Sequence, residues 1–270
     1  MTRAGGRSRR NEAIPIQEKH VSGHSKWSTI KRKKGKTDAA RGKIFTKLIK
    51  EITVASRGGG GDPGSNPRLR TAILAGKSQN MPQDNIKRAI LKGTGEIPGV
   101  VYEEHTYEGY GPAGVAIFVE CLTDNKQRTV AEVRHILSKY GGNLGENGCV
   151  SFIFQRQGEI QVSAEGVNED ELTDAALEAG ADDLRDDGEV FAVITPHSEL
   201  HTVRDTLEGR GYKIESAELV MNPNTTVTLN ESQAMSFLKT FDALEECDDV
   251  QKVWANFDIS DEVMSKLSAV

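Results

Sequence analysis

Residues 37–58 place apolar and basic positions at the spacing of an α-helix. With about 100° per residue and Lys43 as origin, four apolar side chains fall between about 140° and 240°: Phe45, Leu48, Ile49 and Ile52. Three basic side chains fall within about 40° of Lys43: Lys47, Lys50 and Arg57. The pattern therefore predicts a helix with one buried face and, opposite it, an exposed basic face.

Two shorter helices are predicted after the breaker-rich loop 58–67. The first begins after Asn66, with Pro67 in its first turn and apolar residues on one side. The second starts near Pro82, carries Lys87, Arg88 and Lys92, and ends at Gly93. Together the three helices predict a small helical domain, followed by a linker at 93–99.

Beyond the linker the periodicity changes to that of strands. Extended segments are expected at 101–107, 115–122 and 149–154, with a helix before the last of these that Gly141 closes. From 160 to 220 the expected order is βαββαβ, which is the ferredoxin-like order. A helix at 231–246 and a strand at 250–258 then have no sheet of their own, and we expect them to complete the domain begun at Val101.

The expected fold is thus a multidomain α+β fold, with an N-terminal helical domain followed by two α/β domains. The predicted domains are a disordered extension (1–21), a basic helical domain (22–98), a discontinuous α+β domain (99–157 and 223–270) and a ferredoxin-like domain inserted into it (158–222). The extension has no apolar core and is not a secretory signal. A start codon called too far upstream is another interpretation of it.

Charge is unevenly distributed along the 270 residues, whose overall formal charge is −6. Residues 1–98 contain 22 lysines and arginines against 7 acids, and residues 99–270 contain 12 against 33. Between Gly23 and Lys50 there are ten basic residues and one acid, Asp38. Such segregation is typical of a polyanion-binding region attached to something else.

The candidate nucleic-acid-binding residues come from this basic region. They are Lys26, Trp27, Lys31, Arg32, Lys33, Lys34, Lys36, Lys43, Lys47, Lys50, Arg68, Arg70, Lys87 and Arg88. A solvated helix face is the ordinary interpretation of scattered lysines, but the density of cations here favours phosphate contacts. Reversing the charge of Lys43, Lys47 and Lys50 is expected to abolish binding without unfolding the protein. No zinc-finger spacing, RNP motif or heptad-linked basic region predicts base reading.

Trp27 has two interpretations that the sequence leaves open. Its ring stands next to Lys26 and could stack on an exposed base, a contact worth about 1–3 kcal/mol. Alternatively it closes the small helical core, where few large apolar rings are available.

Motifs that resemble catalytic or ligand sites are incomplete. Gly109, Gly111 and Gly114 fit GxGxxG but precede a strand instead of joining strand to helix, and the glycine run 58–61 lacks the GK[ST] of a P-loop. We therefore predict no catalytic residue and no cofactor.

Metal sites are not predicted either. His197 and His201 lack the glutamate placement of HExxH, and the acidic run 182–189 carries Arg185 at the third position of an EF-hand register.

Three widely spaced cysteines argue against a disulfide framework and fit a reducing compartment. With no apolar run of about 18 residues, no membrane contact is expected and the cytoplasm is the predicted location.

Three long segments closely resemble the YebC/PmpR family of bacterial regulators, whose mitochondrial relatives are translational activators of cytochrome oxidase. They are "SGHSKWSTIKRKKGKTDAARGKIFTKLIKEITVASRGGGGDPGSNPRLRTAI", "NMPQDNIKRAILKGTGE" and "YEGYGPAGVAIFVECLTDNKQRTVAEVRHILSKYGGNLGENGCVSFIF". The resemblance implies a three-domain molecule with a helical first domain and a ferredoxin-like third domain inserted in the second.

The resemblance and the charge pattern together predict a non-enzymatic cytoplasmic regulator that binds DNA and acts on transcription. The alternative is a translation factor that binds ribosomal RNA and helps elongation through proline-rich stretches. A nucleic-acid hydrolase is a remote alternative, because it requires a metal cluster that the sequence does not show. The acidic domains are expected to contact proteins.

Overall fold

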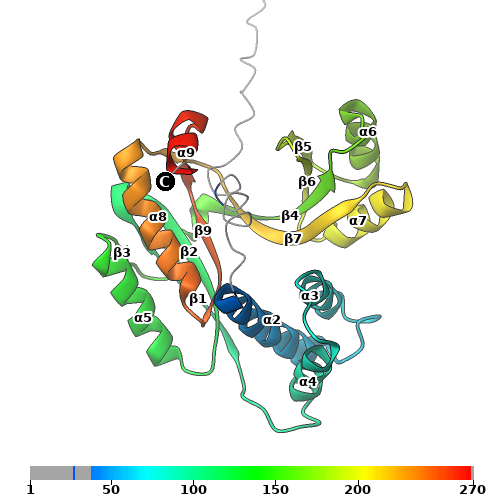
Figure 1. Ribbon diagram of the computed structural model, residues 1–270, viewed down its shortest axis with the longest axis horizontal. Coiled ribbons are helices and arrows are strands. Elements are labelled where there is room, and N and C mark those ends of the chain that lie inside the picture. The colour runs from blue at the N-terminus through cyan, green and yellow to red at the C-terminus, as the bar shows by residue number, and fades with distance from the viewer. Residues whose placement is uncertain (1–26, 28–37, 269–270) are drawn as a thin grey trace, which may run out of the picture.

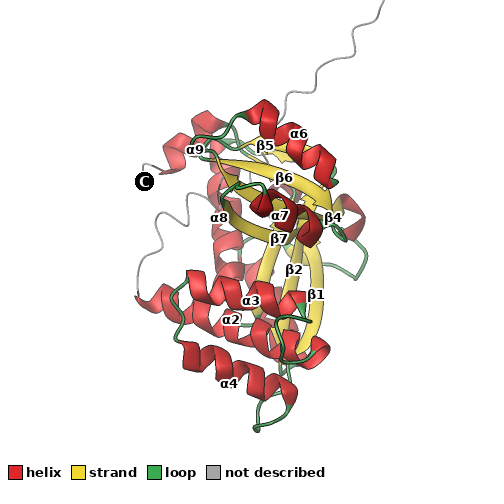
Figure 2. Cartoon of the chain, turned by 90° about the vertical axis from the view of Figure 1, so that its right-hand side faces the viewer, coloured by secondary structure: helices red, strands yellow, loops and turns green. Residues whose placement is uncertain are grey.

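The computed structural model describes Trp27 and residues 38–268. Its described secondary structure forms a bundle of helices, a four-stranded sheet with helices on one face, and a second four-stranded sheet (Figure 1). Figure 1 shows the first sheet with α5 and α8 on the left, the second sheet on the right and the bundle below both, and Figure 2 shows the bundle and the second sheet at opposite ends of the view. The predicted α+β fold class is confirmed.

The bundle consists of α2 (Asp38–Gly59), α3 (Pro67–Ser78) and α4 (Gln83–Thr94). Helix α3 begins as predicted, because the Asn66 side chain accepts a hydrogen bond from the backbone N–H of Leu69 at 3.1 Å. Helices α2 and α4 approach so closely that a Cβ on Gly93 would lie 2.4 Å from the carbonyl oxygen of Thr53. Only glycine fits there. The core of the bundle is apolar and includes Ile52, Leu69 and Ile86.

The first sheet is antiparallel, with strand order β3-β1-β2-β9. Its strands are β1 (Glu103–Tyr110), β2 (Ala116–Thr123), β3 (Asn143–Leu144) and β9 (Val250–Ala255). Helices α5 (Lys126–Lys139) and α8 (Glu231–Glu246) cover one face, and their apolar sides share a core with β1, β2 and β9. A short 3₁₀ turn, η1 (Pro112–Gly114), joins β1 to β2. The pair β8 (Val227–Thr228) and β10 (Phe257–Asp258), and helix α9 (Asp261–Ser268), lie beside this core.

The second sheet has the order β5-β6-β4-β7, all antiparallel. Its elements are β4 (Phe154–Ser163), α6 (Glu169–Ala179), β5 (Asp183–Asp186), β6 (Val190–Pro196), α7 (Leu200–Gly209) and β7 (Ile214–Pro223). Because the first and third strands of the unit lie at the centre, this is the ferredoxin-like arrangement, and the predicted βαββαβ order is confirmed.

Strands β4 and β7 pair with each other beyond the part of the second sheet that β6 reaches, since β6 pairs with β4 only from Gln157 on. Phe154, Val220 and Met221 pack with Phe118 and Trp254 on the face of the first sheet opposite α5 and α8. The domain boundaries expected at 157/158 and 222/223 stay predictions, and both fall within these two long strands.

The strand predicted at 149–154 is wrong. Residues 151–153 form the 3₁₀ turn η2 (Ser151–Ile153), and β4 starts only at Phe154. The reason is Glu108, which is 5% exposed and accepts hydrogen bonds of 2.8 Å from the backbone N–H groups of Gly148, Val150 and Ser151. Burial alone would raise the pKa of Glu108, but these donors lower it below its ordinary value. Backbone groups held by a buried carboxylate are not available to a strand ladder.

The strand predicted at 250–258 is interrupted at Asn256. Its side chain accepts from the backbone N–H of Ala116 at 2.7 Å and donates to the carbonyl oxygen of Thr225 at 3.1 Å. Strand β9 therefore ends at Ala255, and the chain continues as β10 on another partner. None of the described helices combines the length and hydropathy needed to cross a lipid bilayer.

Candidate nucleic-acid interface

Helix α4 carries an exposed basic face. Ile86, Ala89 and Gly93 are buried in the bundle, and the helical period places Lys87, Arg88 and Lys92 on the outside. All three are exposed, and none of them forms an ion pair with any residue that the structure describes. We call these three residues the α4 basic face. Lys92 was not among the predicted candidates, although it follows Arg88 by one helical turn.

Two further exposed cations stand at helix ends of the bundle. Arg57 lies in the last turn of α2 and Lys77 in the last turn of α3. Neither was predicted as a nucleic-acid contact. Cations in a last turn have an ordinary structural role, because they offset the negative end of the helix dipole. They add positive charge to the bundle without showing a ligand.

The predicted stripe Lys43, Lys47 and Lys50 faces the C-terminal end of α8. The Lys47 Nζ donates to the carbonyl oxygen of Glu245 at 2.7 Å, and the Lys43 Nζ to that of Glu246 at 3.2 Å. Lys43 remains exposed and Lys47 is half-buried. Both lysines thus already serve as hydrogen-bond donors within the protein.

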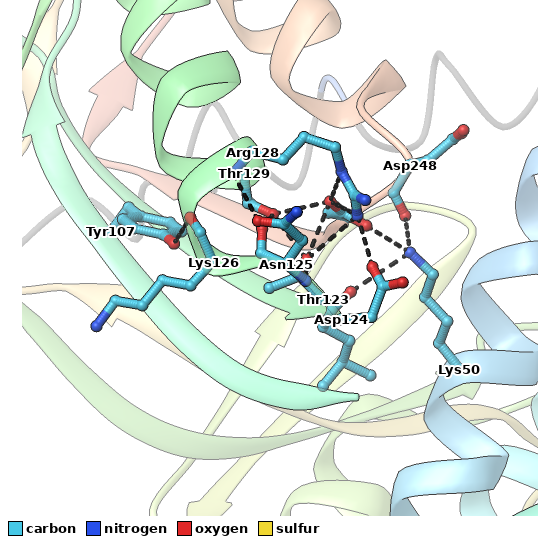
Figure 3. A network of polar contacts seen from close by, with 11 residues as sticks. Lys50, Tyr107, Thr123, Asp124, Asn125, Lys126, Arg128, Thr129 and Asp248 are labelled. Carbon is cyan, nitrogen blue, oxygen red and sulfur yellow. Dashed lines mark hydrogen bonds and ion pairs between the residues drawn. The ribbon is translucent and has the colours of Figure 1, made fainter. Parts of the chain in front are cut away.

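Lys50 is the most deeply placed of the three. Its Nζ lies 2.8 Å from Oδ1 of Asp249 and 2.9 Å from the carbonyl oxygen of Asp248, and Lys50 is 7% exposed (Figure 3). The expectation that Lys50 lies on an exposed face is wrong. Reversing its charge is now expected to destabilise the protein, since a glutamate at 50 would face the Asp249 carboxylate inside the protein.

Asp249 organises this junction. Its Oδ2 accepts from Arg128 Nη2 at 2.8 Å, from Thr129 Oγ1 at 2.8 Å and from Thr123 Oγ1 at 3.2 Å. Burial would raise the pKa of Asp249, but hydrogen bonds from Lys50, Arg128 and Thr129 lower it to about 2. One carboxylate therefore connects helix α2 with the end of β2 and the start of α5. Figure 3 shows Lys50, Thr123, Arg128 and Thr129 around this junction.

The low pKa of Asp249 predicts a defined effect of acid on stability. The folded value of about 2 lies below the ordinary value of 3.8, so the carboxylate stabilises fully above about pH 4. This contribution is lost as the pH falls through about 2. We expect the melting-temperature difference between wild type and Asp249→Asn to be constant near neutral pH and to narrow from about pH 4 to pH 2. A difference that persists unchanged in acid would contradict the assigned role.

Arg68 and Arg70, also predicted contacts, are both turned towards other parts of the protein. The guanidinium of Arg68 is paired with Glu51 of α2 at 2.7 Å and with Glu104 of β1 at 2.5 Å. Arg70 is half-buried, and its charge, after burial and Arg204, helps to lower the pKa of His201 on α7. Arg68 is therefore already paired with acids of two other elements, and the charge of Arg70 acts on the second α/β unit.

Trp27 lies outside the bundle core. Its ring is half-buried against the core of the first sheet, and Nε1 donates to Oδ1 of Asp242 on α8 at 3.4 Å. The interpretation that Trp27 closes the core of the helical bundle is therefore wrong, because the ring packs on the core of the first sheet instead. The other predicted candidates, Lys26, Lys31, Arg32, Lys33, Lys34 and Lys36, lie outside the described residues.

The incomplete motifs have structural roles. Gly109 has no room for a side chain, because a Cβ there would lie 2.4 Å from the carbonyl oxygen of Asn143. Arg185, within the acidic run, pairs with Glu159 at 2.9 Å. Across the described part of the chain, no three His, Cys, Asp or Glu side chains come together as possible metal ligands.

Fold and charge define a class of protein in which a basic helical bundle is joined to two α/β units. Comparison with known families agrees: the model described as "TACO1/YebC protein N-terminal domain" matches residues 25–96, and that described as "TACO1/YebC second and third domain" matches residues 102–257. The chain belongs to the TACO1/YebC family, which confirms the resemblance found in the sequence.

Individual relatives extend over almost the whole chain. A protein of Syntrophus aciditrophicus is 60% identical over 92% of this chain and 100% of its own, and one of Geotalea uraniireducens is 59% identical over the same shares; both are named probable transcriptional regulatory proteins. The crystal structure of a conserved hypothetical protein from Aquifex aeolicus is similar, with 51% identity and a TM-score of 0.77 over 84% of this chain and 94% of that one.

Proposed function

We propose that this protein is a non-enzymatic, cytoplasmic regulator of gene expression that binds DNA through its helical bundle and acts on transcription. The observation that carries the proposal is the α4 basic face, whose three cations are exposed and form no ion pair with the described residues. The names of the relatives, probable transcriptional regulatory proteins, support the same class of function.

The position of α4 suits a large polyanion. In both views α4 lies on the outer side of the bundle, away from α8 and from the second sheet (Figures 1 and 2). Acidic residues are concentrated beyond residue 98, in a part of the chain that contains 33 acids and only 12 lysines and arginines. A duplex that contacts α4 therefore approaches the positive part of the molecule first, while the acidic units are repelled from it and remain available for protein partners.

Contacts of this kind position the protein but do not read sequence. Lysine and arginine bind phosphates of any sequence, and such contacts carry no sequence information by themselves. Preference for a promoter then has to come from DNA shape or from a protein partner held by the acidic units.

The proposal predicts strong binding to duplex DNA that falls steeply with salt. With about six phosphate contacts, counterion release lowers the affinity roughly a thousandfold between about 50 and 200 mM salt. Fluorescence anisotropy with a labelled duplex measures this dependence, and footprinting with competitor DNA measures promoter preference. A chain that ignores duplex DNA at about 20 mM salt but co-sediments with ribosomes would contradict the transcriptional role and favour ribosomal RNA as the target.

A further inference from the structure

The C-terminal end of α8 offers the lysines of α2 the same chemistry as a nucleic-acid strand. Residues 245–249, which we call the α8 acidic end, contain Glu245, Glu246, Asp248 and Asp249. The last carbonyl groups of a helix have no partner within it and carry partial negative charge. Helix α8 has no basic residue in its own last turn. The result is a short row of oxygen acceptors with added carboxylates, and cations from elsewhere have to satisfy it.

Helix α2 supplies those cations from successive turns. Lys47 binds the carbonyl of Glu245 at 2.7 Å and Lys43 that of Glu246 at 3.2 Å. Their spacing of four residues matches about one helical turn, so both ammonium groups lie on the same side of α2 and reach two neighbouring carbonyls. The contact therefore involves the lysines that the sequence marks as phosphate ligands.

The three lysines of α2 differ in how deeply their contacts with residues 245–249 are buried. Lys50 is 7% exposed and is paired with the buried Asp249, whereas Lys47 is half-buried and Lys43 is exposed. An exposed lysine exchanges its partner at little cost, because solvent screens both the old and the new contact. The junction at Lys50 can thus stay closed while the outer two lysines change partner.

We propose that the α8 acidic end is an intramolecular competitor of nucleic acid for Lys43 and Lys47. In the arrangement that the structure shows, both lysines bind α8. Nucleic acid then contacts other residues of the bundle. When a phosphate strand takes Lys43 and Lys47, these side chains leave the α8 acidic end while Lys50 and Asp249 hold the two units together. The proposal rests on the proposed function, since it describes the regulation of the same surface.

Neutralising the competitor tests this directly. The variant E245Q/E246Q/D248N leaves every lysine and Asp249 in place. The backbone carbonyls that accept from Lys43 and Lys47 also stay, but three carboxylate charges beside them are removed, so the attraction that holds the two ammonium groups there weakens. We therefore expect this variant to bind a labelled duplex about three- to tenfold more tightly than wild type at low salt. The matched control E165Q/D174N/E208Q changes the net charge equally at exposed acids near or on α6 and α7. Its affinity is expected to stay within about twofold of wild type.

A double-mutant cycle identifies the lysines responsible. Adding K43Q/K47Q to E245Q/E246Q/D248N should remove the gain in affinity. In the wild-type background, K43Q/K47Q should lower the affinity less than it does in the E245Q/E246Q/D248N background. An equal gain in the control, or a gain that survives K43Q/K47Q, would overturn the competition. Melting temperatures show whether each variant is folded, and Glu246→Gln alone, at an exposed side chain, repeats the test with the smallest change. If wild type binds DNA through α4 but E245Q/E246Q/D248N binds it no more tightly than the control variant, the competition is contradicted and the proposed function stands. If wild type binds no nucleic acid, the proposed function and the competition both fail.

Discussion

Replacing Asp249 by alanine is expected to lower the free energy of unfolding by about 3–5 kcal/mol, because it removes one partner of a buried charge pair. The Lys50 ammonium would remain inside the protein next to the carbonyl oxygens of Leu122 and Asp248 and the ring of Tyr102, without a carboxylate partner. Thr129, which is fully buried, would lose its hydrogen bond of 2.8 Å to the carboxylate. Urea denaturation followed by circular dichroism measures the loss.

The adjacent residue provides the control. Asp248 is exposed and contributes its backbone carbonyl to Lys50, so Asp248→Ala keeps that contact. We expect it to change stability by less than about 0.5 kcal/mol, as is usual for surface substitutions. Equal losses in the two variants would show that the Asp249 carboxylate does not hold the junction together.

Reversing the charges of Lys87 and Arg88 is expected to weaken duplex binding roughly ten- to hundredfold at low salt, because two phosphate contacts become repulsive. The slope of log affinity against log salt should fall by about two, since each contact releases about one counterion. The variant K87E/R88E is expected to fold normally, because both side chains are exposed and α4 is held in the bundle by Ile86, Ala89 and Gly93.

The matched control for this experiment is R134E/K139E. It makes the same change in net charge at two exposed positions of α5, which lies outside the bundle. If the two variants lose affinity equally, the effect comes from net charge and the α4 basic face is not the contact surface. Anisotropy titrations of wild type and both variants at several salt concentrations separate these outcomes.

The order of helices and strands could be predicted because it depends on local patterns. Apolar residues at helical spacing, the Asn66 cap and the alternation of the strands each act within a few residues, and the structure confirms the βαββαβ order that they predict. The prediction of a strand at 149–154 was wrong because the Glu108 carboxylate accepts hydrogen bonds from the backbone N–H groups of Gly148, Val150 and Ser151, which lie 40 residues or more later in the chain. No local pattern contains that contact.

The candidate site shows the same division. Periodicity places Lys43, Lys47 and Lys50 correctly on one side of α2, but it cannot show what that side touches. The partner of Lys50 lies 199 residues away, in a segment whose acids look like any solvated turn. Lys87 and Arg88 remain exposed as predicted, because their helix packs only through its apolar side.

The pairing of β9 with β2 has a consequence for the order of events during synthesis. Strand β2 is complete at Thr123, but its neighbour in the sheet appears only with Val250–Ala255. All the strands and helices of the ferredoxin-like unit, from Phe154 to Pro223, leave the ribosome in between. Since contiguous segments fold as units while the chain is made, this unit is expected to fold before the first sheet is complete, and β2 keeps an open edge until β9 arrives.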